Sequence, residues 1–102
     1  MEKTIFNLSI HPAGPNDANL MLTGFPSADE VGHQYEDAYE FEGAIKKHIS
    51  WVNTDPKVQF DSEYCQFFVY VDDRATMDRL IADIQAHYAT AKAKMDEAIA
   101  MY

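Results

Sequence analysis

The last third of the chain carries the feature that most limits its fold. Residues 74–102 contain neither proline nor glycine, and apolar side chains recur there at alternating spacings of four and three residues. The members of this heptad stripe are Met77, Ile81, Ile84, Tyr88, Ala91, Met95, Ala98 and Tyr102. The stripe predicts one long helix with Asp72 or Asp73 as its N-cap.

The length of this helix raises a question of packing. About 29 residues at about 1.5 Å each span roughly 43 Å, whereas a domain of 100 residues has a radius of gyration of only about 13 Å. We therefore expect one of three arrangements. The helix extends past its own domain, breaks near residues 89–93, or packs against a second copy of the chain.

Four segments predict β-strands. Residues 4–10 and 19–25 flank a loop rich in proline and predict a hairpin with a long connection. Residues 57–60 and 64–71 predict a second pair, joined by a tight turn. The segment 64–71 has an apolar face that we expect in the core, made of Cys65, Phe67, Val69 and Val71. Its other face, which we expect on the uncovered side of the sheet, consists of Tyr64, Gln66, Phe68 and Tyr70.

Residues 34–43, between the two strand pairs, combine four carboxylates and three aromatic rings with no base. The stretch alternates like a strand, but acids at its start and Lys46, Lys47 and His48 further on complement a helix dipole. We expect a helix from about Tyr35 to about Val52. Its inner stripe would consist of Tyr35, Ala38, Phe41 or Glu42, Ile45, Ile49 and Val52.

The order of elements is therefore ββαββα. This order predicts an α+β fold, with a four-stranded antiparallel sheet, two helices on one face and a long C-terminal helix. With 102 residues, the chain has the length of a single domain, residues 1–102.

The formal net charge of -9, from 17 acids and 8 bases, argues against direct binding to nucleic acid or to an anionic membrane. It favours a basic protein partner. Residues 29–42 carry six of the acids and no base, so the charge is concentrated. These acids are Asp29, Glu30, Glu36, Asp37, Glu40 and Glu42. The single cysteine and the lack of a long apolar segment indicate a cytoplasmic protein.

Catalytic chemistry finds little support in the sequence. His33 with Asp37 and Glu40 or Glu36 would suit a metal on one edge of a helix, but a solvated acidic face with a surface histidine explains these residues better. Cys65 is expected in the core, where a thiol acts as a small hydrophobe. No glycine-rich phosphate loop and no CxxC motif occurs. We therefore predict no catalytic residue, no cofactor and no metal.

The charge pattern favours a non-enzymatic, acidic protein-binding module. Spaced carboxylates can imitate a run of phosphates, as a phage-type inhibitor (anti-CRISPR or anti-restriction) would do on the basic nucleic-acid-binding surface of a larger complex. The expected partner-binding residues are the six acids of residues 29–42 together with Tyr64, Phe68 and Tyr70.

The heptad stripe supports an alternative of another class. The chain would then be a small structural or ligand-binding protein that forms a homodimer through its C-terminal helix. The expected interface residues are Tyr88, Met95 and Tyr102.

Overall fold

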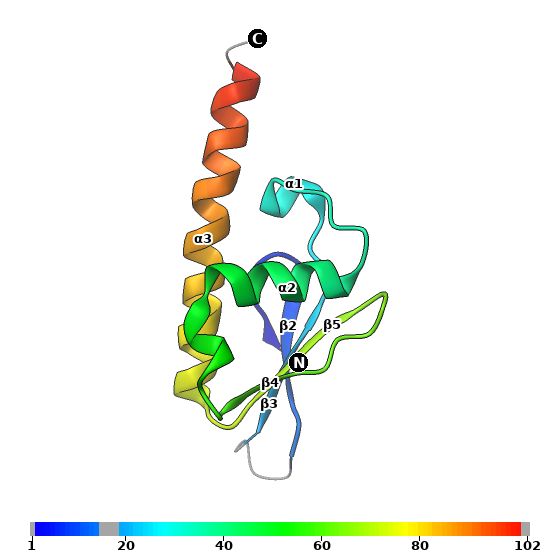
Figure 1. Cartoon of the computed structure of the whole chain (residues 1–102), viewed down its shortest axis with the longest axis vertical. Coiled ribbons are helices and arrows are strands. Elements are labelled where there is room, and N and C mark those ends of the chain that lie inside the picture. Colours follow the sequence, from blue (N-terminus) through cyan, green and yellow to red (C-terminus); the bar gives the residue numbers. More distant parts are fainter. Residues whose placement is uncertain (1, 15–18, 101–102) are drawn as a thin grey trace.

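The computed structural model describes residues 2–14 and 19–100. In this part of the chain, helices cover one face of a five-stranded antiparallel sheet (Figure 1). The strands are β1 (Glu2–Lys3), β2 (Leu8–Pro12), β3 (Leu20–Gly24), β4 (Val58–Phe60) and β5 (Phe67–Val71). They lie in the order β1-β2-β3-β5-β4. The helices are α1 (Ala28–Val31), α2 (Ala38–His48), the 3₁₀ helix η1 (Ser50–Asn53) and α3 (Arg74–Ala100).

The α+β class, the antiparallel sheet and the long C-terminal helix are confirmed. The predicted number of four strands is wrong, because residues 4–10 do not form one continuous strand. Phe6 and Asn7 both have positive φ angles, 54° and 59°, and the Leu8 amide donates to the Ile5 carbonyl oxygen at 2.9 Å. This tight turn folds β1 back onto β2 and so creates the fifth strand.

Gly24 allows this turn to lie against the end of β3. Its φ angle is 144°, a value that side chains rarely permit, and a Cβ atom there would overlap the carbonyl oxygen of Asn7. The Asn7 side chain also donates to the Phe25 carbonyl oxygen at 3.1 Å. The β1–β2 turn and the end of β3 therefore fit together only with glycine at position 24.

The core lies between the sheet and the helices. The side chains of Phe67, Val69 and Val71 on β5 are fully buried, as predicted, and the Phe41 ring of α2 lies 4.9 Å from that of Phe67. Cys65 is the exception, because it is exposed. Glu63 and Gln66 form an isolated bridge that leaves Tyr64 and Cys65 in a turn, so β5 begins only at Phe67.

The inner stripe predicted for residues 35–52 is buried, as expected, but the helix α2 within this range is shorter than predicted. The buried members are Tyr35, Ala38, Phe41, Ile45, Ile49 and Val52. Helix α2 begins at Ala38 because the Asp37 side chain caps it, accepting from the Glu40 amide at 2.9 Å. After His48 the chain continues as η1, which buries Val52.

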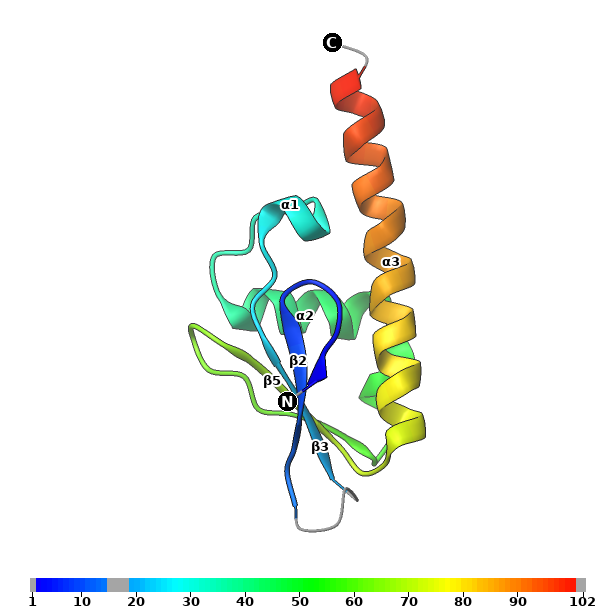
Figure 2. The same ribbon diagram turned by 180° about the vertical axis from the view of Figure 1, so that it is seen from behind.

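Helix α3 is continuous and extends past the domain, which is the first of the three expected arrangements (Figure 2). Asp73 caps it by accepting from the Thr76 amide at 2.7 Å. The buried apolar residues in the described part of this helix are Met77, Leu80, Ile84 and Tyr88, and Thr76 is buried beside them in its first turn. Leu80 is fully buried, whereas Ile81 of the predicted stripe is half-buried and packs against the edge of the core. The longest dimension is 52 Å, against 24 Å for the other two.

The two glycines at positions 24 and 43 should respond in opposite ways to alanine. Gly24→Ala should lower the free energy of unfolding by at least about 2 kcal/mol, because the new Cβ overlaps Asn7. Gly43→Ala, in the middle of α2, should raise it by about 0.5–1 kcal/mol, because a Cβ there meets no atom within 4 Å. Urea unfolding followed by circular dichroism measures both. Equal effects of the two substitutions would contradict this description of the β1–β2 turn.

Candidate functional site

The start of α2 and the turn between β4 and β5 form one corner of the molecule. The Ala38 amide donates to the Tyr64 carbonyl oxygen at 3.0 Å, which joins the two segments. Tyr39 is 54% exposed and Tyr64 is 64% exposed. We call residues 36–40 and 61–66 the helix–hairpin corner. Together they contain five acids (Glu36, Asp37, Glu40, Asp61 and Glu63) and no base.

Three of the six acids predicted to bind a partner have local structural roles. Glu30 completes a capping box with Ser27, whose amide donates to the Glu30 Oε1 at 2.9 Å. Asp37 caps α2. Glu42 pairs with Lys46 at 3.2 Å and also accepts from the Ser62 amide. These contacts within the chain give Glu30, Asp37 and Glu42 a structural role that needs no partner protein.

The other three acids, Asp29, Glu36 and Glu40, are exposed. Glu36 and Glu40 lie in the helix–hairpin corner, where the Glu36 amide donates to the Glu40 Oε1 at 3.4 Å. Asp29 lies on α1, a separate helix. The acidic surface expected from the sequence is therefore divided, and only part of it lies beside exposed aromatic rings.

The three predicted aromatic residues do not share one surface either. Tyr64 belongs to the helix–hairpin corner, whereas Phe68 and Tyr70 lie half-buried on the face of β5 that points away from the core. On that face Phe68 is paired with Thr23, and Tyr70 with Met21. Cross-strand packing of this kind stabilises a sheet by itself. The rings of Phe68 and Tyr70 therefore have a structural role that Tyr64 lacks.

Tyr88 belongs to the chain's own core. It is 2% exposed, and its hydroxyl lies 2.6 Å from that of Tyr35. This leaves almost no surface of Tyr88 for a second copy. The side chain of Met95 and all of Tyr102, the other two expected interface residues, lie outside the described part of the chain.

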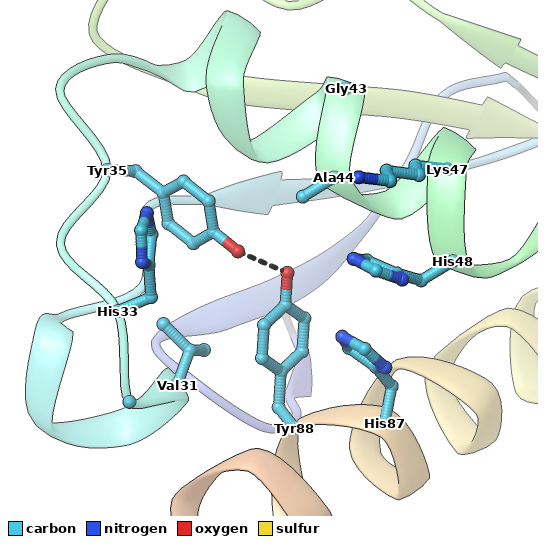
Figure 3. Close-up of a pocket in the computed structure, with 10 residues that line it drawn as sticks. Val31, His33, Tyr35, Gly43, Ala44, Lys47, His48, His87 and Tyr88 are labelled. Carbon is cyan, nitrogen blue, oxygen red and sulfur yellow. Dashed lines mark hydrogen bonds between the residues drawn. The ribbon is translucent and has the colours of Figure 1, made fainter. Parts of the chain in front are cut away.

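A second site, which the sequence did not predict, is a cleft of about 380 Å³ between the α1–α2 connection, α2 and α3 (Figure 3). Its described lining consists of Val31, Gly32, His33, Tyr35, Gly43, Ala44, Lys47, His48, His87 and Tyr88. We call it the histidine cleft. The rings of His48 and His87 are stacked, with centroids 4.3 Å apart and an angle of 20° between their planes. The His33 ring meets the Tyr35 ring edge-on at 4.7 Å.

Burial changes the protonation of several groups in this cleft. It raises the pKa of Tyr88 far above its usual range, and the hydrogen bond to Tyr35 adds to the effect. Burial also raises the pKa of Tyr35. The pKa of His87 is lowered, first by burial and then by the nearby His48. Both tyrosines therefore stay protonated at neutral pH, and His87 favours its neutral form.

No regular pattern in the sequence marks this cleft. His33, His48 and His87 come from three different segments with no regular spacing, and three of the four histidines of the chain meet there. The structure does not bring His33 together with Asp37 and Glu40. Among residues 2–14 and 19–100, no three histidine, cysteine or acidic side chains form a group that could hold a metal ion.

Comparisons with protein-family models, with curated proteins and with solved structures gave no match to this chain. None of the helices in the described residues has both the length and the apolar character needed to cross a membrane. A functional interpretation therefore depends on the two sites themselves.

The buried tyrosine pair should make the protein sensitive to alkali. Because folding raises both pKa values, the two hydroxyls ionise more readily in the unfolded chain, and their contribution to stability is complete below about pH 10. Above that pH the free energy of unfolding should fall, by up to about 1.4 kcal/mol per pH unit for each tyrosine.

Urea unfolding between about pH 8 and about pH 11 measures this slope. The double variant Tyr35→Phe/Tyr88→Phe should have a shallower slope than the parent. The control Tyr39→Phe/Tyr64→Phe, which removes two exposed hydroxyls, should keep the parent slope. The same slope in all three proteins would show that the buried pair does not resist ionisation.

Proposed function

We propose that this chain is a non-enzymatic protein-binding module that docks its helix–hairpin corner on a basic surface of a larger protein. The observation that carries the proposal is the position of Tyr39 and Tyr64. They are 54% and 64% exposed, on segments joined by the bond from the Ala38 amide to the Tyr64 carbonyl oxygen. A soluble domain gains no core stability from rings left in water, whereas exposed tyrosines are frequent at the centre of protein interfaces.

The acids around these rings favour one kind of partner. The five carboxylates of the corner would attract a surface rich in lysine and arginine and repel an acidic one. Charge on the rim of an interface mainly speeds association, whereas buried rings slow dissociation. We therefore assign the rate of encounter to Glu36, Glu40 and Glu63, and the lifetime of the complex to Tyr39 and Tyr64.

The basic nucleic-acid-binding surface of a larger complex fits this description best. Such a surface is built to bind regularly spaced phosphates, and the chain offers carboxylates within an overall charge of -9. An inhibitor of the phage type, acting in the cytoplasm against a nucleic-acid-processing complex, is the specific form of the proposal. Its support is the size and charge of the chain together with the geometry of the corner.

Charge reversal in the corner should abolish binding without unfolding the domain. Glu36→Lys/Glu40→Lys changes the net charge from -9 to -5, since each substitution adds two charges. It leaves the Asp37 cap intact. The matched control Asp72→Lys/Glu97→Lys gives the same net charge from exposed positions at the far end of β5 and on α3. Each tagged protein is used to capture partners from a lysate, at about 0.05 M and about 0.5 M salt.

We expect the parent and the control to capture the same basic nucleic-acid-binding protein at low salt, with less at high salt, and the corner variant to capture none. Tyr64→Ala should weaken the purified complex by about tenfold or more, mainly by faster dissociation. Equal capture by the corner variant would contradict the proposal. So would capture that does not depend on salt.

The length of α3 favours a second candidate, a homodimer assembled through that helix. The part of α3 beyond Tyr88 extends from the domain (Figure 1), and Ile99 on it is 65% exposed. An exposed apolar side chain at this distance from the core would suit a contact with a second copy of the helix.

Truncation after Ala91 separates the two candidates. The shortened protein keeps Tyr88 and the rest of the core, so it should fold with little loss of stability. Under the homodimer candidate, sedimentation should show a dimer of the full chain and a monomer of the shortened one. Under the corner proposal, the shortened protein should still bind the partner with its affinity unchanged.

A further inference from the structure

We propose that the histidine cleft binds a small organic oxyanion, with an aromatic phosphate monoester as the ligand class that fits it best. This site is separate from the helix–hairpin corner, and the inference does not rest on the proposed function. A cleft of about 380 Å³ lies within the size range of small-molecule sites, which is about 300–1,000 Å³.

The charge of the lining is opposite to that of the chain. The sequence has 17 acids and 8 bases, yet the ten described lining residues include one lysine, three histidines and no acid. Lys47 and each imidazole can donate a hydrogen bond to an anion. Of the two tyrosine hydroxyls, the one that accepts from the other keeps its own hydrogen and is a further donor. The surroundings therefore suit a negatively charged ligand, although the protein as a whole repels one.

Two carboxylates lie close to the cleft without lining it. Glu40 precedes Ala44 by one helical turn on α2, and its charge acts on Tyr35. Asp83 precedes His87 by one turn on α3, where it accepts a hydrogen bond from the Trp51 indole at 2.7 Å. Asp83 is thus directed to Trp51, and the imidazoles of His48 and His87 have no carboxylate partner among the described residues.

The stacking of His48 and His87 favours an anion over a metal ion. A metal ion lies in the plane of each imidazole that binds it, on the axis of a nitrogen lone pair. The planes of the His48 and His87 rings are only 20° apart and the ring centroids are 4.3 Å apart, so the two planes intersect far from both rings. One metal ion therefore could not lie in both ring planes at bonding distance. Protonated rings have no such restriction, because each can donate an N–H to a different oxygen of one anion. In Figure 3 each ring has a nitrogen on the side of the Tyr35–Tyr88 pair.

The remaining lining suits an aromatic body on the ligand. Val31 and Ala44 are apolar, and the rings of Tyr35 and Tyr88 form part of the wall. Gly43 keeps this side of the cleft open, since a Cβ there would meet no atom within 4 Å. An aromatic ring could therefore lie along the wall while its phosphate meets the basic groups.

Binding should be coupled to proton uptake. In the empty cleft, burial lowers the pKa of His87, and the nearby His48 lowers it further. A bound anion favours the protonated ring of His87, so its pKa should rise on binding. The affinity should then fall as the pH rises from about 7 to about 8, a range in which the phosphate monoester is already mostly a dianion. The other titratable or charged groups around the two rings are His33, Lys47, Tyr35, Tyr88, Glu40 and Asp83.

Isothermal titration of the full chain with phenyl phosphate at about pH 7, where this ligand is mostly a dianion, tests the site, with benzyl alcohol as the neutral probe and inorganic phosphate as the anion alone. We expect phenyl phosphate to bind more tightly than either. Titrations in two buffers of different ionisation enthalpy should show proton uptake on binding.

Variants locate the site. Lys47→Gln should weaken phenyl phosphate binding by about tenfold, whereas Lys3→Gln, which removes an exposed lysine on β1, should leave it unchanged. Gly43→Leu should fill the cleft and abolish binding, and the matched Gly43→Ala should keep it within about twofold. Thermal melts confirm that each variant is folded.

Four results would overturn the inference. These are no binding of phenyl phosphate at millimolar concentration, equal binding of benzyl alcohol, equal weakening by Lys3→Gln and Lys47→Gln, and unchanged binding by a folded Gly43→Leu variant. Equal affinity for inorganic phosphate and phenyl phosphate would overturn the assignment of an aromatic ligand.

Discussion

The hydrogen bond between the hydroxyls of Tyr35 and Tyr88 holds the helical layer of this protein together. The oxygens lie 2.6 Å apart and are buried, so neither hydroxyl could lose its partner without the cost of an unsatisfied polar group. Tyr35 belongs to the connection between α1 and α2, and Tyr88 to α3. The bond therefore joins two parts of the chain that are 53 residues apart.

Aromatic rings extend this contact to the sheet. Phe41 of α2 lies 5.4 Å from Tyr35 and 4.9 Å from Phe67 on β5, and Phe6 meets Tyr88 edge-on at 5.8 Å. The position of α2 follows from these contacts. Its first turn then reaches the β4–β5 turn to form the helix–hairpin corner, and its last turns form one wall of the histidine cleft. Both candidate sites thus depend on one buried cluster.

Local chemistry made much of the fold predictable from the sequence. The buried stripe from Tyr35 to Val52, the apolar face of β5 and the Asp73 cap follow from periodicity and from capping, which involve residues close in the chain. The β1–β2 turn was missed because phenylalanine at a positive φ angle has no sequence signature. Cys65 was misplaced because the Glu63–Gln66 bridge, rather than the alternation of residues, sets the start of β5.

The sites were less predictable because they depend on contacts between distant segments. The capping box of Ser27 with Glu30 and the Glu42–Lys46 pair follow from local spacing, and both form. The Asp37 cap, the contact of Glu42 with the Ser62 amide and the division of the acids between α1 and α2 appear only in the folded chain. The bond that places Tyr64 beside Glu36 and Glu40 joins residues 38 and 64. Nor could the spacing of His33, His48 and His87 indicate that they line a common cleft.

A nuclear magnetic resonance titration of the isotopically labelled chain with a short oligoarginine peptide tests the central claim most directly. If the helix–hairpin corner is the surface that receives a basic partner, the amide shifts at low salt will concentrate in residues 36–40 and 61–66 and will disappear at high salt. Shifts spread evenly over other exposed acids, such as Asp72, Asp78 and Glu97, would contradict the claim and reduce the charge of -9 to a means of keeping the protein soluble.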